Sequence, residues 1–476
     1  MKERNWMGKF DTYCTYIQQK YSVPGIAIGL SDNGNIVLEK GYGYRDIKDK
    51  KEVTSKTIFG IASITKSFTC AGIMLLQEAN KLSVQDKVRK YLPEFQLPDK
   101  NELSDEVTIH HLMTHTTGIP PLSSLSYAMK RSMDVDASAD DYPGLALSGK
   151  TGAPIDTYKQ LMIHIKNSDV KLLGRPGEQF SYSNDCYALL GAIIAQVSGQ
   201  TYEAFITDNI LKPAGMNNST FDLHQVKQAS NVTEQYSMSV SNSGDDKAYA
   251  APVWWDAPAM RGAGFLRSTM EDMLKYGEIY RTGGMVGSTR ILSTESVIQM
   301  IQPYVKFEPN RFYGYGLMIT PDYHGGTLVE HGGSLKAISS QLSVIPEKGI
   351  VGITLSNLVG VPAFDLMNGV INGVLGLPIE TPFKTFNVED NVDEEELEQY
   401  IGTYCSEEGA NLTIDMDETG LNLTQQEKSF PLKHIKESLF TIKMKESEAP
   451  VRFLFAEEGE VRGISMGLRQ IPKVTS

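Results

Sequence analysis

The chain has 476 residues and a mass of 52.6 kDa, enough for two or three domains and at least one large hydrophobic core. With 41% hydrophobic and 22% charged residues, its composition is typical of a soluble globular protein and excludes a fibrous or disordered chain. The formal net charge of -13, without a cluster of lysines and arginines, argues against nucleic acid as a partner.

The N-terminal segment and the cysteines indicate the compartment. Residues 1–16 lack the apolar core of a secretory signal, so the chain as given is predicted to be cytoplasmic, although a protein whose leader had been removed would look the same. The apolar stretch 359–379 is interrupted by polar residues and predicts a packed helix, so no transmembrane segment is expected. The cysteines have no zinc-like or disulfide-like spacing and are expected to be free thiols: Cys14, Cys70, Cys186 and Cys405.

The first elements in the chain are a hairpin and a helix. Residues 25–43 contain two β-rich runs around Asn33 and Gly34, a pair that favours a tight turn. From Ser63 onward the apolar residues recur at helical spacing, and Asn80 is placed to end the helix.

The middle of the chain predicts an α+β fold. Residues 119–175 are rich in Gly, Asp, Ser and Pro, which indicates a long excursion over the surface. Residues 327–335 and 339–357 read as strands, the latter as a pair joined at 346–349. We expect a mixed antiparallel sheet with helices on its faces and an inserted helical subdomain.

The C-terminal part has a different sequence pattern. The acidic run at 387–399 lacks an apolar period and predicts a linker, which we place at 383–396 between a catalytic domain at 1–382 and a small domain at 397–476. In the last segment short β-like runs alternate with turn residues every eight to twelve positions, which is typical of a small antiparallel β-barrel or sandwich.

Two short motifs match known patterns by chance. Residues 144–151 spell the phosphate-binding loop, but that loop must open a helix, and Gly152, Ala153 and Pro154 prevent one. Residues 463–467 spell the nucleophile elbow of α/β-hydrolases, but no Asp, Glu or His follows to complete a triad, so Ser465 is expected to be a strand residue.

Neither the histidines nor the second Ser-x-x-Lys pattern suggests a site. His110, His111 and His115 lie close together, but no carboxylate or thiol completes a zinc-like spacing, so capping and packing roles are favoured. The pattern at Ser168 and Lys171 runs into Gly and Pro residues that break any helix.

The first Ser-x-x-Lys pattern, Ser63 and Lys66, has the geometry that chemistry needs. Residues three apart on a helix are neighbours. A serine hydroxyl is a weak nucleophile until a base takes its proton, and a lysine can be that base if burial lowers its pKa. A helix start also offers backbone N–H groups to a developing oxyanion.

Four further segments follow in the chain: 111–119, Tyr182 to Asn184, 262–276, and His331 to Ser334. With Ser63 and Lys66 they resemble, in order and spacing, the penicillin-recognising serine hydrolases, in the branch of class C β-lactamases, D-alanyl-D-alanine carboxypeptidases and D-aminopeptidases. The resemblance covers residues 8–378, and within it the excursion at 119–175 is expected to fold over the active-site cleft. The tail from about 397 is similar to the lipocalin-like domain appended to some members.

The resemblance implies a role for each matching residue. Ser63 becomes acylated; Lys66 shares its proton with Tyr182, the base for attack and acid for the leaving group; Asn184 orients Lys66 and the substrate amide; and His331 borders the cleft. Ser334, with Gly333 before it, supplies the second oxyanion-hole N–H beside that of Ser63. Lys150, Thr151 and Gly152 spell the family's commonest third box, but they precede Tyr182 in the chain, so His331 to Gly333 is the better match.

The histidine at 331 stands where the family often has lysine. A histidine is charged only part of the time near neutral pH, which weakens a strict β-lactamase or carboxypeptidase assignment. The resemblance therefore implies a metal-independent and cofactor-free serine hydrolase acting on small peptides that contain D-amino acids. The alternatives are a carboxylesterase or β-lactamase on the same scaffold, and a non-catalytic penicillin-binding scaffold or sensor. The oligomeric state is left open.

Overall fold

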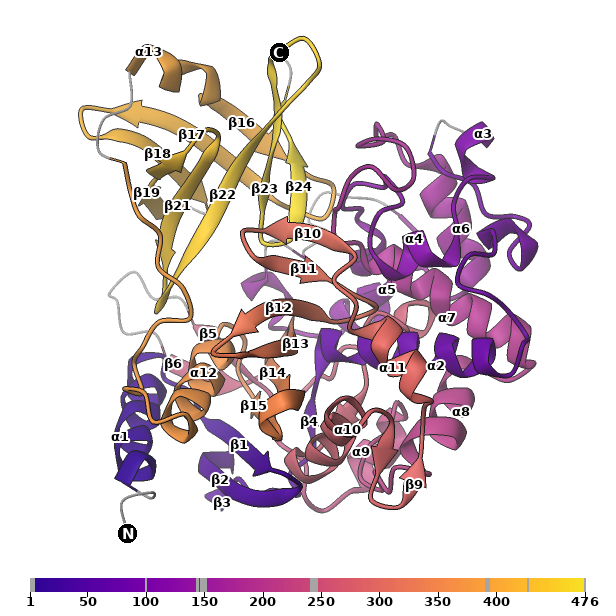
Figure 1. Cartoon of the computed structure of the whole chain (residues 1–476), viewed down its shortest axis with the longest axis vertical. Coiled ribbons are helices and arrows are strands. Elements are labelled where there is room, and N and C mark those ends of the chain that lie inside the picture. Colours follow the sequence, from indigo (N-terminus) through magenta and orange to yellow (C-terminus); the bar gives the residue numbers. More distant parts are fainter. Residues whose placement is uncertain are drawn as a thin grey trace.

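The computed structural model describes residues 5–98, 101–142, 145, 152–239, 247–389, 394–425 and 428–474 (Figure 1). Two bodies of structure are visible in it. The larger one combines a sheet with many helices, and the smaller one, coloured orange to yellow, consists mainly of strands from the last part of the chain.

A single antiparallel sheet organises the larger body. Within the described residues it has nine strands in the order β10-β11-β12-β13-β14-β15-β1-β2-β3, and neighbouring strands all run antiparallel. The bounds are β10 Val305–Glu308, β11 Arg311–Tyr313, β12 Met318–Tyr323, β13 Gly326–Leu335, β14 Ile338–Ile345, β15 Ile350–Ser356, β1 Gly25–Asp32, β2 Asn35–Asp46 and β3 Lys51–Glu52. This confirms the predicted antiparallel sheet.

Both predicted tight connections are present. Asn33 and Gly34 join β1 to β2 and have positive φ angles of 48° and 80°, the conformation that an Asn-Gly turn tolerates best. Residues 346–349 join β14 to β15, and Gly349 ends this turn with a φ of 72°.

Helices cover both faces of the sheet, as predicted. Adjacent residues of β1 point to opposite sides: Ala27 packs into the larger hydrophobic core, whereas Ile26 and Ile28 pack into a second core with α1 and α12. The helices of the larger body are α1 Asn5–Lys20, α2 Thr65–Glu78, α3 Asn101–Ser104, α4 Ile109–Met113, α5 Ser124–Met133, α6 Tyr158–Asn167, α7 Asn184–Ser198, α8 Tyr202–Ile206, α9 Leu223–Gln228, α10 Met270–Thr282, α11 Thr294–Met300 and α12 Ala363–Val374.

The helical subdomain is inserted between the first strands and the rest of the sheet. Helices α2 to α9 follow β3 in the chain and gather on one side of the molecule (Figure 1). Among the described residues, three short strand pairs accompany the loops: β4 Phe59–Gly60 with β7 Arg267–Ser268, β5 Tyr236–Ser239 with β6 Lys247–Ala250, and β8 Met285–Val286 with β9 Thr289–Arg290. Helix α2 packs against α7, and this contact brings distant parts of the chain together at the site described below.

The C-terminal strands form two antiparallel sheets around their own hydrophobic core. One contains β16 Gly402–Cys405, β17 Asn411–Asp417, β18 Gly420–Gln425 and β19 Lys428–Pro431; the other contains β20 Lys433–Lys436, β21 Leu439–Met444, β22 Ser447–Phe455, β23 Val461–Met466 and β24 Arg469–Pro472. A bridge between Tyr404 and Lys473 links the two sheets, but among the described residues the hydrogen bonding does not close into one ring. Helix α13 Glu394–Leu397 precedes them.

Two regions join the C-terminal body to the larger one. Near α1 and α12, Lys20 pairs with Glu446 at 2.6 Å and Asp365 accepts a hydrogen bond from Ser447. At the other end, the turn between β23 and β24 contacts the segment before α7, where the backbone N–H of Tyr182 donates to the Leu468 carbonyl at 2.9 Å.

The apolar stretch late in the chain is a packed helix, as predicted. It forms α12, whose Met367 and Val370 are buried in the second core. Within the described residues, none of the helices combines the length and the apolar content needed to cross a bilayer.

Candidate active site

Ser63 lies at the start of a helix, as the sequence predicted. It is the middle residue of a 3₁₀ turn, Ala62–Ile64, that leads directly into α2. Ala62, one residue earlier, has a φ of 43°, which is strained for a residue with a Cβ. Such strain is often found beside functional groups, because the surrounding structure must hold the backbone in place.

Lys66 lies in the first turn of α2 and is fully buried. Its Nζ lies 3.2 Å from Ser63 Oγ, 2.8 Å from Asn184 Oδ1 and 2.7 Å from the Ala263 carbonyl oxygen. Burial lowers the pKa of Lys66 well below its ordinary value; the charge of Arg469 lowers this pKa further, and that of Glu408 opposes the effect. Lys66 therefore has the contacts and the lowered basicity of a lysine that can exchange a proton with Ser63.

Tyr182 lies beneath the Lys66 amine. The Nζ atom is 4.7 Å from the centre of the Tyr182 ring. Burial raises the pKa of Tyr182, while the Ser63 hydroxyl and the Arg469 charge act to lower that pKa. Because burial dominates, Tyr182 holds its proton in the resting site, which suits an acid more than a base.

Asn184 opens α7, and its amide has two charged or titratable neighbours. Ser183 caps the helix, with its Oγ accepting from the Cys186 N–H. The Asn184 Oδ1 accepts from Lys66, and its Nδ2 donates to Glu408 Oε1 at 3.1 Å. The amide group that the family resemblance assigns to the substrate is thus bonded to a carboxylate of the C-terminal body.

The strand β13 brings Ser334 to the same cavity as Ser63. Gly333 makes the close approach of β13 possible: a Cβ at this position would lie 2.3 Å from the Ile61 carbonyl oxygen and 3.1 Å from the Ser63 nitrogen. Ser334 and Ser63 therefore line one cavity from two elements.

His331 is on β13 but does not line that cavity. It is buried, its Nε2 lies 3.1 Å from the Tyr313 hydroxyl, and its Nδ1 donates to the Gly332 carbonyl at 2.6 Å. Burial, with the nearby Lys66, lowers the pKa of His331 to about 3. The part-time positive charge expected near neutral pH is therefore absent from this histidine.

A chain of hydrogen bonds assigns the tautomers of two histidines. The Ser183 N–H donates to His115 Nδ1 at 3.1 Å, so the proton of His115 is on Nε2, which faces the Tyr313 hydroxyl at 3.2 Å. Tyr313 can then donate to His331. Because the His115 ring lies 4.3 Å from that of Tyr182, this chain forms one wall behind the tyrosine.

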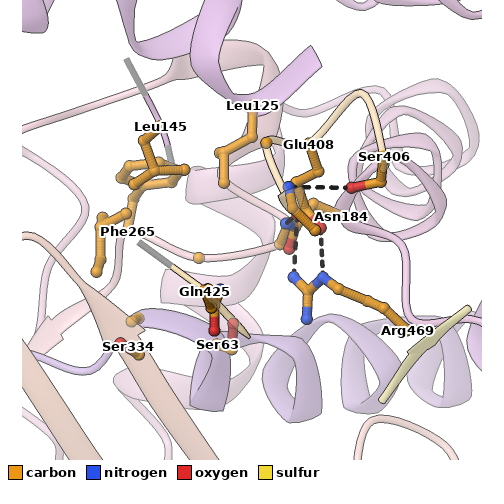
Figure 2. A pocket seen from close by; sticks show the side chains of 16 residues that line it. Ser63, Leu125, Leu145, Asn184, Phe265, Ser334, Ser406, Glu408, Gln425 and Arg469 are labelled. Atoms are coloured by element: carbon orange, nitrogen blue, oxygen red, sulfur yellow. Dashed lines mark hydrogen bonds and ion pairs between the residues drawn. The ribbon is translucent and has the colours of Figure 1, made fainter. Parts of the chain in front are cut away.

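The cavity in front of Ser63 has a volume of about 340 Å³ and two contrasting walls (Figure 2). The excursion contributes to it, as expected, and so does the C-terminal body. Apolar residues form one wall: Leu125, Leu145, Phe265 and Leu335. Polar or charged residues form the other: Asn184, Ser406, Glu408, Gln425 and Arg469.

Glu408 and Arg469 are site residues that the sequence reasoning missed. Arg469 donates to both oxygens of Glu408, from Nε to Oε2 and from Nη2 to Oε1, the latter at 3.0 Å (Figure 2). The Arg469 guanidinium also lies 5.0 Å from the Tyr182 ring centre. Both residues are at hairpin turns, where a charged side chain carries no signal that separates it from an ordinary surface residue.

The remaining motifs have structural roles where they are described. His110 bonds the Tyr315 hydroxyl at 2.8 Å, and His111 forms a capping box with Thr108, as the packing and capping interpretation predicted. Ser168 ends α6 and shares no helical face with Lys171, and Ser465 lies in β23. The phosphate-loop match at 144–151, apart from Leu145, and the residues Lys150 and Thr151 lie outside the described residues.

The sequence matches two protein families. Residues 10–373 match the family described as Beta-lactamase, and residues 387–474 match a domain of unknown function, DUF3471. The first match covers most of the chain, including every cavity residue named above except Ser406, Glu408, Gln425 and Arg469. These four belong to the second match.

Individual proteins are similar over much of the chain. Protein flp of Staphylococcus aureus (strain MW2) is 29% identical over 360 residues, 74% of this chain and 63% of flp, so the chain spans less than two thirds of that relative. The octameric penicillin-binding protein homologue from Pyrococcus abyssi is 27% identical, with a TM-score of 0.68 over 98% of this chain and 100% of that one. SurE, solved with D-Leu, shares the fold at 19% identity and a TM-score of 0.68, over 98% and 99% of the two chains.

Proposed function

Since the chain belongs to the beta-lactamase family, whose members are serine hydrolases, we propose that it hydrolyses its substrate through an acyl-enzyme on Ser63. One observation carries this proposal: the Lys66 amine is buried, has a pKa well below its ordinary value, and lies 3.2 Å from the Ser63 hydroxyl. A neutral lysine in that position can take the serine proton as the Ser63 Oγ bonds to the substrate carbonyl carbon.

Each further site residue then has a step. As the Oγ–C bond forms, the carbonyl π electrons move to oxygen, and the backbone N–H groups of Ser63 and Ser334 stabilise the resulting anion. Tyr182, protonated at rest, supplies the proton to the leaving group when the tetrahedral intermediate collapses. Water then attacks the ester carbonyl carbon and gives a proton to the Tyr182 phenolate; the C–Oγ bond breaks, and Lys66 returns to Ser63 Oγ the proton that it took. His331 does not line the cavity; it accepts a hydrogen bond from Tyr313, whose ring packs against that of Tyr182.

For the substrate we propose small peptides or amides that contain a D-amino acid. The cavity of about 340 Å³ is of a size for a compact acyl group, and its wall of Leu125, Leu145, Phe265 and Leu335 suits an apolar side chain. The polar wall opposite suits an amino, amide or carboxylate group. The preference for D stereochemistry comes from the resemblance of the third box, His331 to Gly333.

A second candidate function is hydrolysis of β-lactams or of a C-terminal D-alanine. It is favoured by Arg469, a cation on the cavity wall, because both substrate classes carry a carboxylate. The absence of lysine at position 331 is therefore a weaker argument against them than the sequence suggested. Arg469 already pairs with Glu408, however, which ranks this function second.

The test is intact-protein mass spectrometry after incubation with a β-lactam, an activated ester, and D- and L-alanyl amides, combined with turnover assays. We expect an adduct or turnover in the wild type that is lost in Ser63→Ala while the melting temperature is unchanged. Ser168→Ala, in the second Ser-x-x-Lys pattern, is the matched control and should behave as wild type.

The compound that reacts fastest distinguishes a peptidase from an esterase or a penicillin binder. Turnover that persists in Ser63→Ala would contradict the proposal. A wild type that neither forms an adduct nor turns over any of the probes would favour the non-catalytic scaffold.

A further inference from the structure

The side-chain amide of Asn184 lies between a lysine and a carboxylate. Its Oδ1 faces Lys66 Nζ at 2.8 Å, and its Nδ2 faces Glu408 Oε1 at 3.1 Å. The two ends of an amide have nearly the same shape, so the partners decide which end points where. A carboxylate can only accept hydrogen bonds, and it therefore requires the NH₂ group of Asn184 on its side.

Glu408 is itself held in place by Arg469. The guanidinium donates to both carboxylate oxygens of Glu408, the bidentate arrangement that is most specific for a carboxylate (Figure 2). Glu408 lies in the turn between β16 and β17, and Arg469 begins β24. Both residues thus come from the C-terminal body and not from the body that carries Ser63.

The orientation of Asn184 matters for the lone pair of Lys66. A neutral amine has two N–H donors and one lone pair. The Ala263 carbonyl and the Asn184 Oδ1 are acceptors only, so they take the two donors. The lone pair is left for the third contact, the Ser63 hydroxyl. If Asn184 turned over, its NH₂ group would compete with Ser63 for that lone pair.

We propose that Glu408, anchored by Arg469, is a positioning residue that fixes the Asn184 amide and so directs the Lys66 lone pair at the Ser63 hydroxyl. This inference rests on the proposed function of Ser63 and Lys66. It assigns to the C-terminal body a part in activating the nucleophile: the chain of contacts Arg469, Glu408, Asn184, Lys66 and Ser63 runs from one body to the other.

The relative acylation rates of three variants test this orientation. In Glu408→Gln, an NH₂ group replaces one of the two oxygens that accept from Arg469. With the carbonyl kept opposite Arg469 Nε, the NH₂ takes the Oε1 position that Asn184 shares with Arg469 Nη2, and there it reverses the Asn184 amide. Glu408→Ala removes the acceptor that orients the Asn184 amide but does not reverse the amide. We expect the acylation rate with p-nitrophenyl acetate to fall about 30-fold in Glu408→Gln and about tenfold in Glu408→Ala, within the range of general-base catalysis.

The double variant Glu408→Gln with Arg469→Gln supplies a rescue. Without the donor-only guanidinium, the introduced side chain at 408 is free to accept from Asn184, so the rate should recover to within about fivefold of the wild type. A role in packing or in holding the two bodies together predicts the opposite order, with the double variant slower than either single one.

The pH profile gives an independent readout. The charge of Glu408 raises the pKa of Lys66. Loss of that charge, together with an Asn184 N–H donated to the Lys66 lone pair, therefore lowers the pKa of Lys66 further. The acid limb of the acylation rate should therefore move to lower pH in Glu408→Gln while the plateau falls. A variant that merely folds poorly would lower the plateau and leave the limb in place.

Glu457→Gln, an exposed glutamate of the same body, is the matched control and should keep the wild-type rate. The inference fails, with the proposed function intact, if Ser63 is acylated in the wild type and Glu408→Gln reacts at the wild-type rate, or if Glu408→Ala is the slower of the two. If Ser63→Ala is acylated as fast as the wild type, the proposed function fails first. Melting temperatures of all variants identify any that do not fold, and the double variant then decides.

Discussion

Asp185 carries a carboxyl group that is buried one residue after Asn184, in the first turn of α7. Burial raises the pKa of Asp185 to about 6, and the nearby charge of Glu408 acts in the same direction. In the unfolded chain an aspartate titrates near 3.9. The folded state therefore binds this proton more tightly than the unfolded state does, and stability is lost as the pH rises from about 4 through about 6.

Replacing Asp185 with asparagine should remove this loss. Since one pKa unit corresponds to about 1.4 kcal/mol and the shift is about two units, Asp185→Asn is expected to stabilise the protein by about 3 kcal/mol above pH 7. The gain should vanish near pH 4, where the wild-type carboxyl is protonated in both states. Melting temperatures at pH 4 and pH 7.5 measure this, with the exposed Asp415→Asn as control. An equal gain at both pH values would show that the titration of Asp185 is not the cause.

At the scale of single residues, the sequence predicted what depends on short spacing. Ser63 and Lys66 are three apart, and a helix start was enough to bring their side chains within 3.2 Å. The partners of the histidines depended on the tertiary fold. His331 was expected at the cleft with a part-time charge, but β13 turns its ring toward Tyr313, where burial lowers its pKa to about 3.

Strand β13 and the turn that carries Ser63 approach each other at Gly333. Any Cβ there would lie 2.3 Å from the Ile61 carbonyl oxygen and 2.4 Å from Ser340 Oγ, closer than the backbone can accommodate. We expect Gly333→Ala to displace β13 from the turn and lower the acylation rate at least about 100-fold, the effect of losing one oxyanion donor.

Gly332→Ala is the matched control, because its nearest neighbour, at 3.0 Å, is a side-chain atom, Gln341 Oε1, and not the backbone. It should retain most of the activity. Both rates are measured with the same activated ester, and a Gly332→Ala variant as slow as Gly333→Ala would remove the close approach as the explanation.

The elements themselves were largely predictable. Asn33 and Gly34 specify the turn between β1 and β2, and helical spacing of apolar residues specifies α2, which ends at Glu78 just before Asn80 with its positive φ. The C-terminal strands were expected, but not their division into two sheets. That division depends on which strands pair, and the alternation of polar and apolar residues in a single strand does not encode its partner.

One of the two contact regions between the bodies is the turn between β23 and β24. Leu468 packs beside Tyr182, Tyr313 and Met318, and its carbonyl accepts from the Tyr182 N–H. We expect Leu468→Asp to separate this turn from the segment before α7, because a carboxylate there would be placed in an apolar contact. The acylation rate should fall at least about tenfold.

Val474→Asp introduces the same charge at an exposed position of the same body and should leave the rate unchanged. Rates are measured for both variants at equal protein concentration. A Leu468→Asp variant that stays within twofold of the wild type would mean that the site does not need this contact.

At the scale of the whole molecule, the sequence predicted the order of the parts but not how they meet. The acidic run at 387–399 predicts a linker, yet nothing in the strand pattern of the tail indicates which turn faces the cavity. Glu408 and Arg469 become site residues only because the β23–β24 turn docks against residues 179–184, where Gln470 donates to Ser181 Oγ at 3.2 Å. Complementarity of two folded surfaces decides this, and it has no local signature.

The hydrogen bond between Asn184 and Glu408 joins residues that lie 224 positions apart in the chain. A ribosome adds about 5 to 20 residues per second, so Asn184 is made about 10 to 45 s before its carboxylate partner. During that interval the nascent chain already carries Ser63, Lys66 and Asn184, but the Asn184 amide lacks its hydrogen-bond partner Glu408. If Glu408 guides the Asn184 amide as proposed, the order of segments delays the completed arrangement until nearly the whole chain has been translated.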